Sequence, residues 1–215
     1  MGVLQSVVDA LRERRIFRRA RTDDRVRALG IVLYHLGLSF RDTSLVLDNF
    51  VPRSHEAVRQ WYVRSRGLFQ VRKAQRRALA IDETKVKIQG EWLYVWAAID
   101  VDTWEIVAAW VSYARSNFES YSFVRKALEA CEGKPMVYVD GGPWYRYALE
   151  RLGVPWEHRT FGPRNPIEQW FHVLKHRVKR FYRRWPHNAD MAQVNVWISA
   201  YVACYHLKNG WGSLS

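Results

Sequence analysis

The stretch ALAIDETKVKIQGEWLYVWAAIDVDTWEIVAAWVSY, residues 78–113, decides the fold of this chain. It contains three runs rich in β-branched and aromatic residues, 78–88, 91–101 and 105–113. Turn-forming segments, beginning with Gln89-Gly90, separate them. Short runs of this kind with turn signals between them predict an antiparallel meander of three strands.

The residues after the meander predict alternating helices and strands. The expected elements are a helix at 117–131, a strand at 134–140, a helix at 143–153, a short strand at 154–161 and long helices at 165–185 and 190–207. The order β-β-β-α-β-α-β-α-α predicts an α/β fold: a mixed sheet, in which parallel strands join the antiparallel meander, with flanking helices.

The residues before the meander are predicted to be helical. A short amphipathic helix and basic arm occupy residues 1–23, and three helices follow over 24–66, with Ser39 and Ser54 as caps of the second and third. A tight pair of helices with a basic, aromatic second member is typical of a helix-turn-helix. A three-helix core without DNA contacts is the alternative.

The helix that starts after Ser54 has two distinct faces. On the helix-turn-helix interpretation, Val58, Trp61 and Tyr62 pack inward. The residues expected to face DNA are His55, Arg59, Gln60 and Arg64. The predicted boundaries are an arm at 1–23, a helix-turn-helix at 24–66, a basic linker at 67–77, a catalytic domain at 78–208 and a tail at 209–215.

Charge is segregated along the 215 residues, whose net charge is +13. Residues 1–77 hold 17 Lys and Arg against 7 Asp and Glu, residues 78–163 hold 9 against 12, and residues 164–185 hold 7 against 1. Two basic blocks around an acidic middle predict binding of a nucleic acid, although basic charge can also serve solubility alone. In the second block the expected phosphate contacts are Arg177, Lys179, Arg180, Arg183 and Arg184.

Cysteine usage and hydropathy predict the compartment. Cys131 and Cys204 form no paired motif, which indicates a reducing environment rather than a disulfide framework or zinc knuckle. Asp9, Arg12 and Glu13 interrupt the N-terminal apolar residues, so no signal-peptide core is present there. No apolar run is long enough to cross a bilayer. A cytoplasmic protein is expected.

Three carboxylates stand out by their contexts. Asp82 ends the apolar run ALAI, and Asp140 ends MVYV before a Gly-Gly-Pro turn. Glu168 lies in the first turn of a basic helix, after Asn165 as expected N-cap and Pro166 as first helical residue. Either Asp alone is more often a turn or cap residue, but together at strand ends they predict a shared site.

The carboxylates predict a pair of hard cations, Mg²⁺ or Mn²⁺, held by Asp82, Asp140 and Glu168. Two such ions would promote phosphoryl transfer on a nucleic acid backbone. Lys175, two helical turns after Glu168, is a candidate catalytic residue that would hold a phosphate. Glu168 and His172 do not form the HExxH pattern of a zinc site.

Four ordered motifs carry a family resemblance. They are IDET at 81–84, WLYVWAAID at 92–100, VDGGPWY at 139–145 and RNPIEQWFHVLKHR at 164–177. With them the chain resembles a DDE transposase of the small prokaryotic insertion-sequence type, insertion-sequence family six, over residues 24–207. The acidic triad of that family falls on Asp82, Asp140 and Glu168, and its basic residue on Lys175.

The resemblance implies a ribonuclease-H-like catalytic fold, dependence on two Mg²⁺ ions, and strand transfer from 3′ ends. It also implies double-stranded DNA as partner, namely terminal inverted repeats and target DNA, and a homodimer or larger assembly on that DNA. Two alternatives remain at this point. One is a structure-selective nuclease of the same fold, and the other is a non-catalytic DNA-binding protein derived from a transposase.

Overall fold

The computed structural model describes residues 2–18, 21–88, 90–181 and 189–210. The chain divides into two compact units, residues 1–70 with 196–215, and residues 71–195. The boundary falls inside α8, Met191–Lys208, whereas the predicted catalytic domain ran to residue 208. The second half of α8 groups with the N-terminal helices because Trp197 donates a hydrogen bond to the Tyr34 hydroxyl and Tyr201 packs against His35.

The first unit is helical. Its remaining elements are α1 Val3–Glu13, α2 Asp24–Leu36, α3 Phe40–Asp48, α4 His55–Arg64 and the 3-10 helix η1 Ser65–Leu68. The predicted caps are confirmed: the Ser39 hydroxyl accepts a hydrogen bond from the Asp42 amide at 3.0 Å, and Ser54 accepts one from Ala57 at 3.2 Å. Gly37, with φ of 128°, ends α2.

The second unit is built on a mixed sheet. Among the described residues its strands are β2 Ala78–Ile88, β3 Glu91–Asp100, β4 Ile106–Ser112, β6 Met136–Val139 and β7 Trp156–His158, in the order β4-β3-β2-β6-β7. The first three pair antiparallel, and β6 and β7 pair parallel. This is the predicted meander with added parallel strands, the ribonuclease-H-like arrangement.

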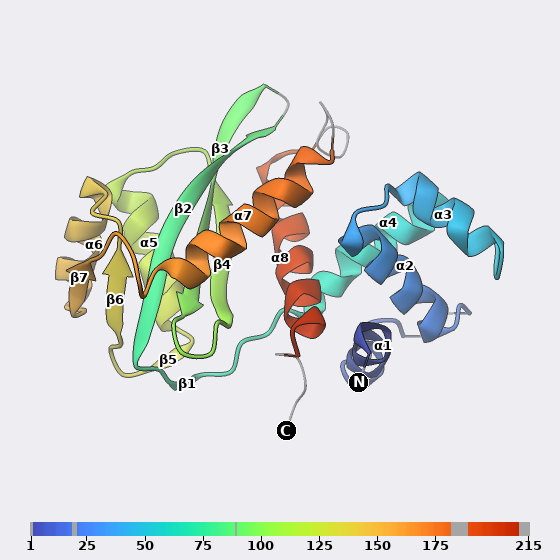
Figure 1. The fold of residues 1–215 in the computed structure, drawn as a ribbon, viewed down its shortest axis with the longest axis horizontal. Helices are drawn as coiled ribbons and strands as arrows, with labels where there is room; N and C mark the ends of the chain where they lie inside the picture. Colours follow the sequence, from blue (N-terminus) through green and yellow to red (C-terminus); the bar gives the residue numbers. More distant parts are fainter. Residues whose placement is uncertain (1, 19–20, 89, 182–188, 211–215) are drawn as a thin grey trace. The chain divides into compact units, whose positions relative to one another are not determined.

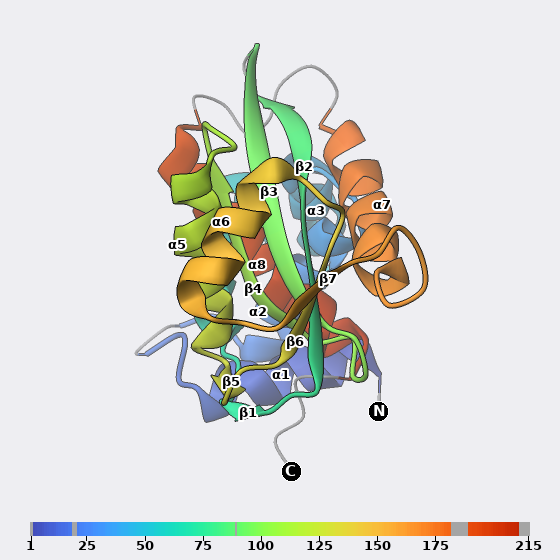
Figure 2. The same ribbon diagram turned by 90° about the vertical axis from the view of Figure 1, so that its left-hand side faces the viewer.

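Helices cover both faces of this sheet. Helices α5 Asn117–Leu128 and α6 Pro143–Leu152 lie on one face, and α7 Asn165–Lys179 lies on the other (Figure 2). The core beneath α5 and α6 includes Trp96, Phe123 and Tyr145, all fully buried. Alternating side chains of β2 and β3 therefore have a helix-covered environment on each side.

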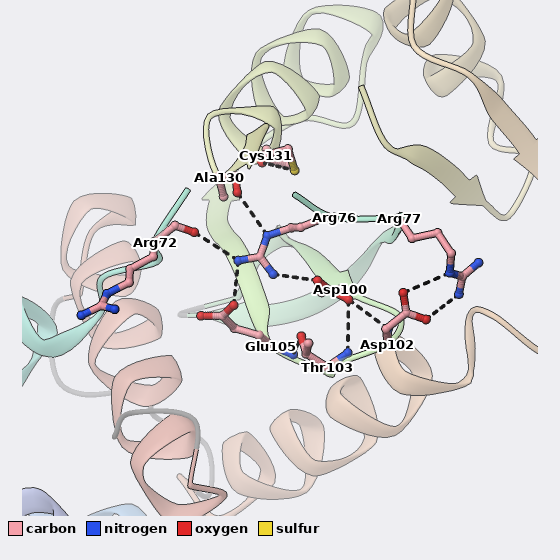
Figure 3. A network of polar contacts seen from close by, with 10 residues as sticks. Arg72, Arg76, Arg77, Asp100, Asp102, Thr103, Glu105, Ala130 and Cys131 are labelled. Carbon is pink, nitrogen blue, oxygen red and sulfur yellow. Dashed lines mark hydrogen bonds and ion pairs between the residues drawn. The ribbon is translucent and has the colours of Figure 1, made fainter. Parts of the chain in front are cut away.

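An arginine network fastens the start of the second unit (Figure 3). Arg76 donates to the Asp100 carboxylate at 2.7 Å, the Glu105 carboxylate at 2.7 Å and the Ala130 carbonyl at 3.1 Å. The Asp100 carboxylate also accepts a hydrogen bond from the backbone amide of Asp102 in the β3–β4 turn. One buried guanidinium thus joins three chain segments beside a small parallel sheet of β1 Ala74–Gln75 and β5 Cys131–Glu132, which was not predicted.

No helix in the described part of the chain is both long enough and apolar enough to span a membrane.

Candidate active site

Asp82 lies in the middle of β2 rather than at its end. The prediction of a strand end was wrong because β2 continues to Ile88 in its pairing with β3. Its parallel pairing with β6, however, stops at Ala80 opposite Tyr138. Asp82 is two positions beyond that last pair, so relative to β6 it occupies the carboxyl edge of the sheet.

Asp140 follows β6 directly and lies at the same edge. Its Oδ1 accepts a hydrogen bond from the Gly142 amide at 3.0 Å, which closes a short turn. Gly141 has φ of 82°, and a Cβ there would lie 3.0 Å from the His158 ring. The glycine is therefore required by backbone conformation and by space. Asp82 and Asp140 are close enough for the charge of one to affect the pKa of the other.

Arg164 connects Asp82 with Glu168. Its Nη2 lies 2.6 Å from Oδ2 of Asp82, and its Nη1 lies 3.8 Å from Oε1 of Glu168. Arg164, rather than the predicted Asn165, is the N-cap of α7, which begins at Asn165. The buried guanidinium thus supplies positive charge between two of the predicted metal ligands.

The pKa of Asp82 is raised from 3.8 to about 7. Burial is the main cause, since the side chain is only 13% exposed. Arg164 opposes the rise in pKa, while the negative charges of Asp140 and Glu83 add to it. This edge of the sheet therefore favours either a proton on Asp82 or additional positive charge beside it.

Within the described ranges, no three His, Cys, Asp or Glu side chains are arranged as a ready metal site. The three carboxylates share one neighbourhood through strand pairing and through Arg164, and their role as metal ligands stays a prediction. Their oxygens are nevertheless the donor type that Mg²⁺ and Mn²⁺ prefer. The raised pKa of Asp82 also fits a site that a cation would stabilise.

A second cluster, not predicted from the sequence, adjoins the site. Glu83, next to Asp82, has a side chain only 2% exposed. It accepts a hydrogen bond from the Tyr145 hydroxyl and pairs with Arg115 at 3.2 Å. Arg115 in turn lies 4.0 Å from the ring centre of Trp144. Burial raises the pKa of Glu83, and the hydrogen bonds from Tyr145 and Arg115 oppose that rise.

The Glu83 cluster ties the IDET motif to the VDGGPWY motif. Tyr145 belongs to α6, which starts directly after the Asp140 turn. The hydrogen bond between Tyr145 and Glu83 therefore fixes the Asp140 turn relative to the strand that holds Asp82. The signal was present in the sequence as an acidic residue on an otherwise core-facing strand.

The predicted basic residues of α7 do not all share one environment. Lys175, Lys179 and Arg180 are exposed. Arg177 is buried, with its guanidinium 4.6 Å from the ring centre of Phe181, so its prediction as an exposed phosphate contact is corrected. Its position three residues after the buried Leu174 places it on the packed face. Arg183 and Arg184 lie outside the described residues.

Helix α4 has the two faces that were predicted. Val58, Trp61 and Tyr62 are buried. The exposed side chains are His55, Arg59, Gln60 and Arg64. Glu56 accepts two hydrogen bonds from Arg59, at 2.8 and 2.6 Å, and one from Gln60 at 3.3 Å. The bonds from Arg59 are the main reason that the pKa of Glu56 falls to about 2.

Comparison with known proteins places this geometry in a family. A family model described as a DDE domain matches residues 76–192, more than half of the chain. An uncharacterized protein of Methanocaldococcus jannaschii is 38% identical, over 94% of this chain and 95% of its own length. A transposase for the insertion sequence-like element IS431mec of Staphylococcus aureus is 31% identical, over 54% of each chain.

Among solved structures, the HTLV-2 integrase catalytic core domain in complex with magnesium is 13% identical. It aligns with a TM-score of 0.46 over 60% of this chain and 85% of its own. The DDE-domain match spans Asp82, Asp140 and Glu168, and the relatives with named activities are transposases of insertion sequences. The chain therefore belongs to the DDE transposases, of the insertion-sequence family six type.

Proposed function

We propose that this protein binds the ends of an insertion sequence and catalyses metal-dependent cleavage of DNA 3′ ends, followed by strand transfer. The observation that carries the proposal is the meeting of Asp82 and Asp140 at one sheet edge, with Glu168 linked to Asp82 through Arg164. Membership of the transposase family supports it. The natural place of action is the cytoplasm, where prokaryotic DNA lies.

The proposed metal ligands are Asp82, Asp140 and Glu168, with two Mg²⁺ or Mn²⁺ ions. When bound, such ions supply activation of the attacking hydroxyl and stabilisation of the leaving oxygen. The protein's own groups position the reaction. The Glu83–Tyr145 bond holds the Asp140 turn, and Arg164 offsets the charge of Asp82. Exposed Lys175, two turns after Glu168, binds a DNA phosphate beside the reacting one.

End recognition is assigned to α4. In a helix-turn-helix the second helix presents side chains to the major groove, and α4 exposes a polar and basic face while burying its aromatic face. Arg59 and Gln60 would read bases, whereas Lys179 and Arg180 of α7, together with Arg183 and Arg184, would contact phosphates. Two copies of the chain, or more, would act together on paired ends and target DNA.

The test uses Asp140→Asn, which preserves shape and removes the charge that a hard cation requires. A labelled end oligonucleotide is incubated with Mg²⁺ and followed for nicking and for joining to a plasmid. Both reactions should fall by a factor of about 10³ or more, while binding to the ends survives. Asp102→Asn is the matched control, because Asp102 is an exposed aspartate of the β3–β4 turn.

The outcome also separates the alternatives. Near-normal joining by Asp140→Asn would refute the metal-ligand assignment. Nicking without any joining by the wild-type protein would favour a structure-selective nuclease. Binding without either reaction would favour a non-catalytic DNA-binding protein. Lys175→Ala should reduce activity less than Asp140→Asn does, and the loss should grow with added salt, since exposed charge contacts are screened.

A further inference from the structure

The hairpin of β2 and β3 has a row of lysines and aromatic rings on one face. Lys85 lies opposite Tyr94, and Lys87 lies opposite Trp92 in the strand register. The Lys85 Nζ lies 5.8 Å from the centre of the Tyr94 ring, and the Lys87 Nζ lies 5.7 Å from that of Trp92. These four side chains are called the hairpin strip.

In the hairpin strip Lys85, Lys87 and Trp92 are exposed and Tyr94 is half-buried, whereas the opposite face of the hairpin is core. Val86, Ile88 and Leu93 alternate with the strip residues and are buried. Helix α7 packs against both strands. Figure 1 shows the hairpin reaching beyond the ends of the neighbouring strands. Trp92 remains 54% exposed, a large apolar surface that the described residues leave uncovered.

The two lysines of the hairpin strip place positive charge on an exposed surface. Within the described part of the chain, neither Lys85 nor Lys87 has a carboxylate at ion-pair distance. The row of cations and rings continues inward, because Arg115 lies 5.3 Å from the centre of the same Tyr94 ring. Arg115 also pairs with Glu83, so the hairpin strip leads to the residue next to Asp82.

We propose that the hairpin strip binds a single strand of DNA next to the reacting end. Lysine charges neutralise phosphates, and the exposed Trp92 ring stacks on a base, a combination typical of single-strand binding surfaces. Bases in a duplex are already stacked on one another, so the ring selects unpaired DNA. The role of this DNA in the reaction rests on the proposed function, whereas the binding itself does not require catalysis.

The first test is Trp92→Ala, with Trp104→Ala as matched control. Trp104 is 38% exposed in the β3–β4 turn, at the opposite end of β3. Fluorescence anisotropy is measured in EDTA with a labelled 20-nucleotide oligothymidylate and with a duplex of equal length. Trp92→Ala should weaken single-strand binding by roughly 5- to 150-fold, the range for losing one base–ring stack. Duplex binding should change by less than about 2-fold, and the control should leave both unchanged.

The second test addresses the lysines. Lys87→Ala should reduce the slope of log affinity against log salt for the oligothymidylate by about 0.7, the value for one lost single-strand phosphate contact. Lys126→Ala, an exposed lysine of α5, should leave that slope unchanged.

Three results for Trp92→Ala would overturn the proposal. The first is an affinity for the oligothymidylate within 2-fold of wild type, and the second is an equal loss of affinity for the oligothymidylate and for the duplex. The third is a change in self-association, measured by sedimentation, without a change in affinity for DNA. The last result would make the hairpin strip a protein interface. Because these measurements exclude metal, a failure of DNA cleavage would refute the proposed function without affecting them.

Discussion

Replacing Asp82 by Asn should change how the stability of the metal-free protein depends on pH. In the folded protein the pKa of Asp82 is about 7, and its ordinary value is 3.8. Between these values the folded chain keeps a proton that the unfolded chain has lost. Its contribution to stability is therefore present below pH 4 and is lost as pH rises through 7. Asn cannot ionise, so the variant lacks this loss.

The size of the effect follows from the two pKa values. A difference of about 3 between them corresponds to ~4 kcal/mol across the whole window. Roughly 2.5 kcal/mol of this falls between pH 5 and pH 8. The free energy of unfolding of Asp82→Asn, minus that of the wild type, should increase by this amount. Any change in packing that the substitution causes is the same at each pH, so it does not affect this increase. At low pH, Arg164 faces a neutral side chain in both the variant and the wild type.

The assay is urea unfolding followed by tryptophan fluorescence, in EDTA, at intervals from pH 5 to pH 8. Asp102→Asn is the control. Arg77 lowers the pKa of Asp102 below its ordinary value of 3.8, so this carboxylate is ionised in the folded and the unfolded chain throughout the assayed range. The difference in free energy of unfolding between Asp102→Asn and wild type should therefore not change from pH 5 to pH 8. The assignment of a buried Asp82 that keeps its proton would be refuted if the difference in free energy of unfolding between Asp82→Asn and wild type changed by less than about 0.5 kcal/mol from pH 5 to pH 8. Repeating the series with Mg²⁺ should flatten the wild-type curve, because a bound cation favours the ionised carboxylate.

Three further predictions follow from the other polar contacts. Arg76→Met should lower the free energy of unfolding by about 3–5 kcal/mol in urea titrations, since it leaves the carboxylate of Asp100 buried without its cation. Tyr145→Phe should cost about 1–3 kcal/mol by the same measurement and lower the cleavage rate, because it removes a hydrogen bond to buried Glu83; unchanged cleavage would contradict the positioning role. Glu56→Gln should tighten binding to end DNA and flatten its sequence preference in competition assays, because it removes a negative charge and releases Arg59; weaker binding would show that Glu56 orients Arg59 for DNA.

Local patterns were sufficient to predict most of the elements. The meander strands and the caps at Ser39 and Ser54 depend on residues near one another in the chain, and the structure confirms them. The proximity of Asp82 and Asp140 followed from their strand contexts, because parallel strands bring such positions to a common edge.

Contacts between distant segments were not predictable in this way. In the sequence Arg164 is one of several basic residues at the start of a basic helix, and nothing near it indicates a special partner. It reaches Asp82 because of the path that the folded chain takes into α7. The partners of Glu83 are distant in the sequence: Arg115, between β4 and α5, is 32 positions away, and Tyr145, in α6, is 62 positions away. Arg177 shares the helical spacing of the buried Trp170 and Leu174, a signal that its basic neighbours obscured. The division of α8 between units depends on aromatic packing that has no local signature.

The order in which the candidate site's segments are synthesised limits when it can form. The β2–β3–β4 pairings join neighbouring segments, whereas β6 must pair with β2 across an intervening strand pair and helix. Pairings between distant segments are slow to form, and chains emerge from the ribosome N-terminus first. A nascent chain that has reached residue 160 holds Asp82 and Asp140 but neither Arg164 nor Glu168. The candidate site can therefore assemble only after the segment that holds Arg164 and Glu168 has emerged and α7 has folded against the sheet, and a chain that stops before Arg164 lacks two of its charged groups.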